Sequence, residues 1–364
     1  MTEETSPVFA VKGHEEAEKL FLDAYNSNRL HHGWLITGPR GIGKAAVAHK
    51  MARFLLHNPP GDAANPGLFG EALEKTPLLS LDTDGMSAVN KIINAGGHSD
   101  LVVVERQLND KGKLRAEIVV DDVRDLQNFF AKTSFDGGWR IAIIDSADEM
   151  NRAAANALLK ILEEPPRNVL LILLAHAPGK LLPTITSRCR KLKLGPLPLN
   201  IVGEILARRY PELTADEING YGILSDGSPG YAMKLAEHEG LDLYIQILEI
   251  LSTLPTLDVP KAHKLADSLS AKKVEAKYIL FGELLTSFIS RLIRHVAARN
   301  NGDISPVEAV LSGELDLMEQ LGQRITLDQW AGLWEKIILK MGRVNLDRKQ
   351  VILNILTLIS QRLH

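Results

Sequence analysis

The chain has 364 residues, of which 45% are hydrophobic and 24% charged, and this length predicts two or three domains because single cores rarely exceed roughly 250–300 residues. A formal net charge of −3 excludes the strong basic excess of many nucleic-acid binders, so contact with DNA needs a local patch or a partner protein. The single cysteine, Cys189, excludes intramolecular disulfides and a cysteine-rich zinc site.

The N-terminal segment, MTEETSPVFAVKGHEE, carries acidic residues and lacks the basic end and apolar core of a secretory signal. No apolar run in the sequence approaches the roughly 18 residues that a membrane-spanning helix needs. We therefore expect a cytoplasmic protein that does not contact membranes.

Five short apolar segments in the first half of the chain are predicted to be strands. They comprise residues 34–37, 101–104, 141–144, 169–174 and 190–194. Their nearly continuous apolar composition is typical of parallel strands that are buried on both faces. Because helical patterns lie between them, we predict a parallel sheet covered by helices.

Two of these helices have clear sequence signals. Asp121 and Asp122 can cap a helix that carries apolar residues on one face, namely Val123, Leu126, Phe129 and Phe130. Residues 153–164 are predicted to form a helix that ends at Pro165, because the residue before a proline is pushed out of helical geometry.

The strand pattern stops after Leu194, and the rest of the chain is predicted to be helical. We predict three parts: an α/β domain over 1–195, a small helical lid over 196–240 and an all-α domain over 241–364. An irregular insertion is expected at about residues 57–98, which are rich in Gly, Pro and Asn. In the last helix, an apolar stripe is expected to pack against other helices: Val344, Val351, Ile355, Leu358 and Ile359.

A phosphate-binding motif follows the first predicted strand. The segment 37–45 reads TGPRGIGKA and fits G-x-x-x-x-G-K, in which backbone N–H groups surround phosphates and the lysine reaches the terminal ones. The alternative is a glycine-rich turn that only enters a helix. The predicted nucleotide-binding residues are Gly38, Pro39, Arg40, Gly41, Ile42, Gly43 and Lys44.

Ala45 departs from this motif, which has Ser or Thr there because the hydroxyl ligates magnesium. A second nucleotide motif ends at Asp145, whose carboxylate follows a buried strand where such proteins hold magnesium. Asp145 is therefore added to the predicted nucleotide site, with capping of the next turn as the alternative. The loop can still bind phosphate, whereas efficient magnesium-dependent chemistry is not expected.

The segment 156–166, NALLKILEEPP, precedes an apolar strand and then Ser187-Arg188-Cys189. This combination resembles the bacterial clamp-loader branch of the AAA+ proteins, and so do residues 11–14 and 29–32. The resemblance covers about residues 9–195. It implies an AAA+/RecA-like P-loop domain with a parallel sheet, followed by a helical lid and an all-α collar that oligomerises.

The resemblance also implies a role in DNA replication, as a component of the DNA polymerase III holoenzyme that helps load the sliding clamp onto primed DNA. The implied partners are the gamma/tau and delta subunits, with the clamp and primer–template DNA reached through the complex. In this family Arg188 would act in trans on ATP bound to a neighbouring subunit, because a guanidinium neutralises charge on the transferred phosphoryl group. A solvated loop arginine is the alternative.

Four departures distinguish this chain from the family's hydrolysing subunits. Ala45 lacks the hydroxyl, Ser146 stands where a water-orienting glutamate is usual, and Gly230 stands where the lid carries a sensing arginine. Residues 175–178, AHAP, lack the usual pair of threonines. These departures predict a subunit that keeps the arginine finger and has no catalytic activity of its own. Whether ATP is bound without hydrolysis is left open.

Many members of this family carry a four-cysteine zinc module where this chain has the 57–98 insertion. That segment contains no cysteine, and His98 alone cannot form a tetrahedral site, so no zinc and no other metal is expected. Two other functions are compatible with parts of the sequence. A self-sufficient ATPase is favoured by Lys44 and Asp145, whereas a small-molecule P-loop kinase would have no use for the Ser-Arg-Cys motif.

Overall fold

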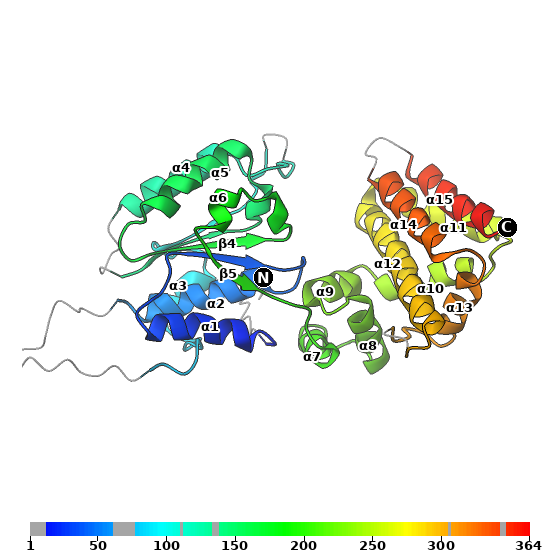
Figure 1. Cartoon of the computed structure of the whole chain (residues 1–364), viewed down its shortest axis with the longest axis horizontal. Coiled ribbons are helices and arrows are strands. Elements are labelled where there is room, and N and C mark those ends of the chain that lie inside the picture. The colour runs from blue at the N-terminus through cyan, green and yellow to red at the C-terminus, as the bar shows by residue number, and fades with distance from the viewer. Residues whose placement is uncertain (1–11, 61–76, 110–111, 133–137, 305–306, 343–346) are drawn as a thin grey trace, which may run out of the picture. The chain divides into compact units, whose positions relative to one another are not determined.

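The computed structural model describes residues 12–60, 77–109, 112–132, 138–304, 307–342 and 347–364 (Figure 1). The chain forms two compact units, Met1–Pro196 and Leu197–His364. The further division of the helical half at about residue 240 stays a prediction.

The first unit contains a five-stranded parallel sheet. Its strands are β1 (Gly33–Thr37), β2 (Leu101–Val104), β3 (Arg140–Ile144), β4 (Val169–Ala175) and β5 (Arg190–Lys193). Their order across the sheet is β2-β3-β4-β1-β5, and each neighbouring pair is parallel. The predicted α/β fold with a parallel sheet is confirmed.

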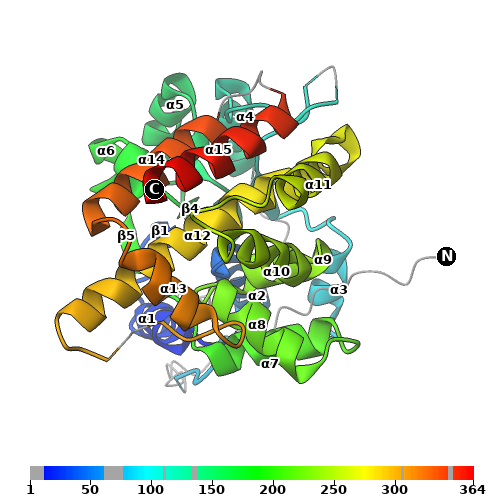
Figure 2. The same ribbon diagram turned by 90° about the vertical axis from the view of Figure 1, so that its right-hand side faces the viewer.

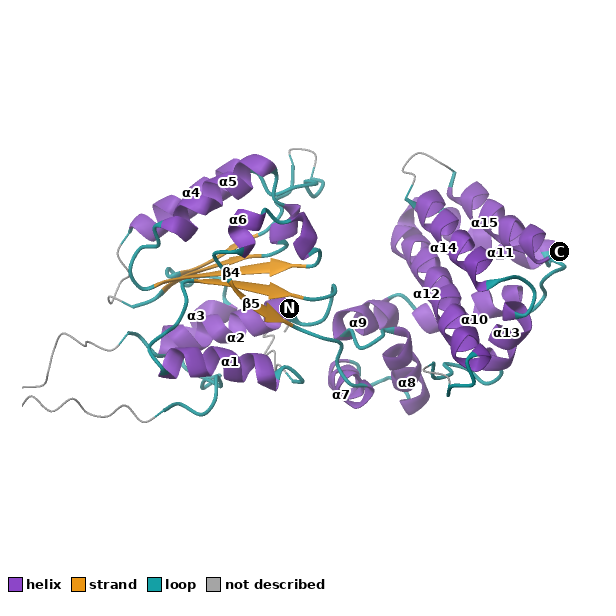
Figure 3. Ribbon diagram, viewed as in Figure 1, coloured by secondary structure: helices purple, strands orange, loops and turns teal. Residues whose placement is uncertain are grey.

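Helices cover both faces of this sheet (Figure 3). One face carries α1 (Glu15–Asn26), α2 (Lys44–His57) and α3 (Ala88–Asn94), and the other carries α4 (Val120–Ala131), α5 (Arg152–Glu163) and α6 (Pro183–Thr186). Successive strand residues point to opposite faces, so Trp34 and Ile36 pack with α1 and α2, whereas Leu35 packs with α4 and α5. Two single-turn 3₁₀ helices, η1 (Ala147–Glu149) and η2 (Pro178–Lys180), follow β3 and β4.

The two outer strands are not buried on both faces, so that part of the sequence prediction is wrong. Val103 in β2 is 40% exposed, and in β5 only Leu192 is buried. Both strands lie at the edges of the sheet, where one side has no neighbouring strand.

The helix boundaries follow from local hydrogen bonds. Val119 is the N-cap of α4, and Asp122, one turn inside, accepts a hydrogen bond from the Val119 N–H at 3.0 Å. Helix α5 begins after Asn151, whose side chain accepts from the Ala154 N–H at 2.9 Å. It ends at Glu163, before Pro165 as predicted.

The described part of the second unit is helical. Its helices are α7 (Leu199–Arg209), α8 (Ala215–Leu224), α9 (Pro229–Glu237), α10 (Gly240–Leu251), α11 (Val259–Ser270), η3 (Lys272–Val274), α12 (Glu275–Asn300), α13 (Glu314–Gly322), α14 (Leu327–Met341) and α15 (Arg348–Leu363). Helix α12 packs against α10, α13 and α14 (Figure 2). Among the described residues, none of these helices is both long and apolar enough to span a membrane.

The apolar stripe predicted for the last helix is present in α15. Val351, Ile355 and Ile359 are buried there, Leu358 is partly buried, and Val344 lies outside the described residues. Residues 61–76 of the expected insertion also lie outside them. The described remainder of that insertion contains α3, so it is not irregular throughout.

Candidate functional site

The phosphate-loop motif lies between β1 and α2, as the sequence predicts. Gly38, Gly41 and Gly43 all have positive φ angles, of 153°, 72° and 102°. The Gly38 N–H donates to the Ala175 carbonyl at the end of β4, and a Cβ on Gly38 would lie 2.6 Å from the Leu194 carbonyl oxygen. Glycine is therefore required here for both conformation and space.

His14 connects the N-terminal segment to this loop. The residue is 7% exposed, and its Nε2 lies 2.8 Å from the carbonyl oxygen of Ile42. Ile42 itself is buried. This contact holds the residues before α1 against the middle of the loop.

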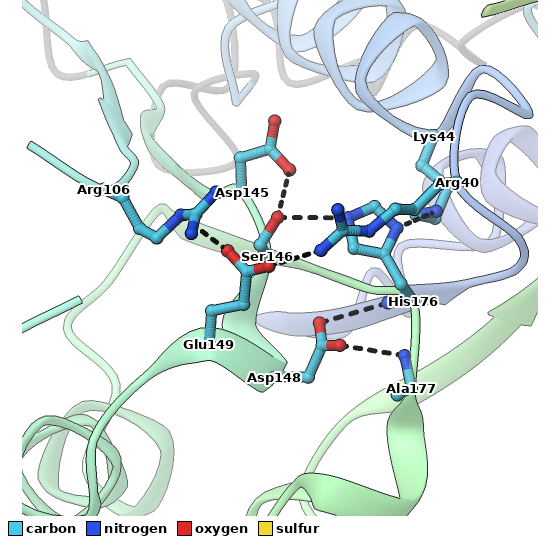
Figure 4. A network of polar contacts seen from close by, with 9 residues as sticks. All are labelled: Arg40, Lys44, Arg106, Asp145, Ser146, Asp148, Glu149, His176 and Ala177. Atoms are coloured by element: carbon cyan, nitrogen blue, oxygen red, sulfur yellow. Dashed lines mark hydrogen bonds and ion pairs between the residues drawn. The ribbon is translucent and has the colours of Figure 1, made fainter. Parts of the chain in front are cut away.

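The Lys44 side chain is turned into its own loop, as Figure 4 shows. Its Nζ lies 2.8 Å from the Gly38 carbonyl oxygen, 2.6 Å from the Pro39 carbonyl oxygen and 2.7 Å from His176 Nδ1. An ammonium has three N–H donors, and these three acceptors match them one to one. The residue is only 4% exposed, and burial lowers the pKa of Lys44 to about 8.

His176 extends this contact into a chain of polar groups (Figure 4). Its Nε2 lies 3.1 Å from Ser146 Oγ, which donates to Asp145 Oδ1 at 3.3 Å. One assignment satisfies every step: Lys44 donates to Nδ1 of a neutral His176, and Nε2–H donates to Ser146. Burial, and then the charge of Lys44, lower the pKa of His176, which favours this neutral form.

Asp148 fixes the backbone at the end of β4. Its two carboxylate oxygens accept the N–H groups of His176 at 3.1 Å and of Ala177 at 2.9 Å. Burial acts to raise the pKa of Asp148, but these backbone hydrogen bonds outweigh it, so the pKa is lowered. A carboxylate held in its charged form thus positions the histidine that contacts Lys44.

Glu149 connects the loop to the segment after β2. Its carboxylate pairs with Arg40 Nη2 at 2.6 Å and with Arg106 Nε at 2.8 Å. The Glu149 side chain is 15% exposed, so both ion pairs are partly protected from solvent. Arg40 of the motif is therefore held by a carboxylate in this conformation.

The residues of this site do not fit a nucleotide-bound magnesium ion. Ala45 offers no oxygen, and the Asp145 carboxylate has Ser146, which is not acidic, as its neighbour in the chain. Among the described residues, no three His, Cys, Asp or Glu side chains are grouped so that they could hold a metal ion. The expectation that the chain holds no zinc stays a prediction.

Arg188 lies near the amino ends of the strands, whereas the phosphate loop lies at their carboxyl ends. It precedes β5, and a Cβ on Gly33, the first residue of β1, would lie 3.4 Å from its carbonyl oxygen. The loop instead follows the last residue of β1. The five residues of β1 therefore separate Arg188 from the loop by roughly 16 Å, at about 3.3 Å per residue.

The Arg188 side chain is 39% exposed and is held by its own unit. Its Nη2 pairs with Glu163 Oε1 at 2.9 Å, and its Nη1 donates to the Thr184 carbonyl at 3.1 Å. Ser187 Oγ donates to the same carbonyl. Cys189 is buried, and burial raises the pKa of its thiol to about 12, which favours the protonated, unreactive form.

Residues 13–198, about half of the chain, match the family model for the DNA polymerase III delta subunit. A delta-prime subunit of DNA polymerase III from Pseudomonas aeruginosa is 38% identical over 205 residues, and one from Escherichia coli is 29% identical over 301 residues. The chain belongs to the delta-prime family of clamp-loader subunits. The resemblance seen in the sequence is thereby confirmed.

The extent of these matches differs. The alignment with the P. aeruginosa delta-prime subunit covers 56% of this chain and 55% of that protein, about half of its length, and the E. coli alignment covers 82% and 81%. A gamma/tau subunit from Mycobacterium tuberculosis is 30% identical over 75% of this chain and 44% of its own length. A gamma subunit-related structure from Thermotoga maritima covers 94% of this chain and 100% of its own, with a TM-score of 0.42 and 17% identity.

Within this delta-prime family member, the structure adds two groups that the sequence motifs did not identify. His176 contacts Lys44 from 132 residues away, and Arg106 shares Glu149 with the loop. The sequence signals for His176 were its place two residues after the predicted strand 169–174, where parallel strands collect functional side chains, and its position in the segment 175–178 that lacks the usual threonines. Gly230 lies in the first turn of α9 in the second unit.

Proposed function

We propose that this chain completes the subunit assembly of a DNA polymerase III clamp loader and supplies Arg188 in trans to ATP bound on a neighbouring subunit. In that role it helps load the sliding clamp onto primed DNA, in the cytoplasm. Its direct partners are gamma/tau and delta subunits, and it reaches the clamp and the primer–template DNA through the complex.

The placement of Arg188 carries this proposal. The backbone of Arg188 lies beside Gly33, the first residue of β1, whereas the chain's own phosphate loop follows the last residue of β1. An arginine there is too distant to neutralise charge on a phosphate held by Lys44. It is partly exposed, so a neighbouring subunit can present a phosphate to it.

We propose further that the chain does not hydrolyse ATP by itself. Ala45 and Ser146 remove a magnesium ligand and a water-orienting carboxylate, and the Lys44 ammonium is engaged within the protein. The same features oppose the two alternatives, a self-sufficient ATPase and a small-molecule kinase, since both need a working magnesium site.

The test is DNA-dependent ATP hydrolysis by a loader reconstituted with gamma/tau and delta subunits. Arg188→Ala is expected to slow turnover at the neighbouring site by a factor of at least about 10³, the low end for removal of an arginine finger. Arg167→Ala is the matched control, because Arg167 is an exposed arginine just before β4 and so also lies near the amino ends of the strands. Equal rates for the Arg188 variant and the wild type would contradict the proposal.

ATP hydrolysis by the isolated chain provides a second test. We expect no ATP turnover above background, with or without primed DNA. Robust turnover by the purified chain that Lys44→Ala abolishes would establish a self-sufficient ATPase instead.

A further inference from the structure

The Lys44 ammonium has no donor left for a phosphate in this conformation. Its three N–H groups are matched by the carbonyl oxygens of Gly38 and Pro39 and by His176 Nδ1. The two carbonyls belong to the loop itself and move with it. His176 directly follows β4, so among the described residues it is the partner of Lys44 that lies outside the loop.

His176 is held in place on three sides. Asp148 accepts its backbone N–H, Ser146 lies within hydrogen-bond distance of Nε2, and Lys44 donates to Nδ1. A phosphate that enters the loop must therefore displace a positioned acceptor rather than a solvent molecule. The contact that must be broken belongs to Lys44, the lysine that the motif uses to bind phosphate.

We propose that His176 is a specificity-determining residue of the phosphate loop: its neutral imidazole holds Lys44, and nucleoside di- or triphosphates bind only when His176 releases it. Protonation of Nδ1 provides the release, because an imidazolium has two N–H donors and no acceptor for Lys44. It also adds a positive charge next to the loop. The inference rests on the phosphate site predicted from the sequence and is independent of the proposed action of Arg188.

The charged groups around His176 set the direction of its pH dependence. Lys44 and Arg40 face it from the loop and α2, and both oppose its protonation. Asp145 and Asp148, which follow β3, favour it. Burial and Lys44 dominate and lower the pKa of His176, so release requires a pH below about 6.5, the ordinary value for histidine.

The experiment is a calorimetric titration of the full chain with ATP in the presence of EDTA, at several pH values between 5 and 8. At pH 7.5, His176→Ala is expected to bind ATP at least about tenfold more tightly than the wild type, and adding Lys44→Ala should remove that gain. As the pH falls toward 5, affinity should rise in the wild type and stay flat in His176→Ala. His263→Ala, which changes an exposed histidine of α11, should follow the wild type.

His176→Gln provides a second variant that keeps a polar group and cannot titrate, so its ATP affinity should also lack the rise at low pH. Thermal unfolding of each variant shows whether His176 only stabilises the fold, in which case stability falls and affinity does not rise. Equal affinities of wild type and His176→Ala at pH 7.5 would overturn the inference, as would absence of binding by either protein at every pH. Neither result would touch the proposed role of Arg188, which is measured in the assembled loader.

Discussion

Arg188 and Glu163 form an ion pair, with 2.9 Å between Nη2 of the arginine and Oε1 of the glutamate. Glu163 is the last residue of α5, and its side chain is 49% exposed. Exposed ion pairs contribute about 0–1 kcal/mol, so this contact can orient the guanidinium without preventing its transfer to a phosphate on a neighbouring subunit.

The weakness of this pair gives the first prediction. Glu163→Gln should change the free energy of unfolding by less than about 1 kcal/mol, because the pair is solvent-exposed. In the reconstituted loader it should alter ATP turnover far less than Arg188→Ala does. A loss of turnover by Glu163→Gln that equals the loss by Arg188→Ala would show that the carboxylate is itself required.

The second prediction concerns Lys44 and pH. Burial lowers the pKa of Lys44 to about 8 from the 10.5 expected in the unfolded chain, so the unfolded chain binds more protons between these values. The contribution of Lys44 to stability must therefore rise as the pH increases through that window. In urea denaturation, the wild type should gain stability relative to Lys44→Met between pH 8 and pH 10. A difference that stays constant with pH would contradict the lowered pKa.

The third prediction concerns a buried ion pair in the second unit. Arg291 Nη1 lies 3.2 Å from Glu314 Oε1, with side chains 5% and 0% exposed, and Tyr244 donates a hydrogen bond to the same carboxylate. Removing one partner of a buried pair costs about 3–5 kcal/mol because the other charge is left uncompensated. Arg291→Ala should therefore lower the free energy of unfolding by about that amount in chemical denaturation.

Helix α12 supplies the control for this prediction. Arg299 pairs with Glu319 at 2.8 Å, but its side chain is 61% exposed. Arg299→Ala should change the free energy of unfolding by less than about 1 kcal/mol. Similar losses for the two arginine variants would mean that burial does not set the strength of the Arg291 pair.

The fourth prediction concerns the backbone of the loop. Gly38 has φ 153°, and an added Cβ would lie 2.6 Å from the Leu194 carbonyl oxygen, so Gly38→Ala should cost at least about 1–3 kcal/mol of stability. Gly179→Ala is the matched control, because an added Cβ there has no described atom within 4 Å. Differential scanning calorimetry of both variants checks this, and equal melting temperatures would contradict it.

Local patterns in the sequence were sufficient for much of the fold. Short segments rich in apolar residues indicated the strands, although 190–194 contains only two apolar residues. Pro165 indicated the end of α5, and the glycine spacing at 38–43 indicated a strand–loop–helix. These features depend on neighbouring residues: a run of apolar side chains, a missing N–H and a backbone that only glycine adopts. The clamp-loader resemblance was likewise visible in contiguous motifs.

The tertiary structure alone decided which distant residues meet. The order β2-β3-β4-β1-β5 places β2 and β5 at the edges, which left Val103 exposed in a segment that the sequence predicted to be buried. The same order sets β4 beside β1, and therefore His176 beside Lys44. The sequence determined that this chain has a phosphate-loop motif and a Ser-Arg-Cys arginine. Only strand pairing, which joins segments more than a hundred residues apart, brought His176 to the lysine of the loop. The same pairing placed Arg188 near the amino ends of the strands, away from the loop at their carboxyl ends.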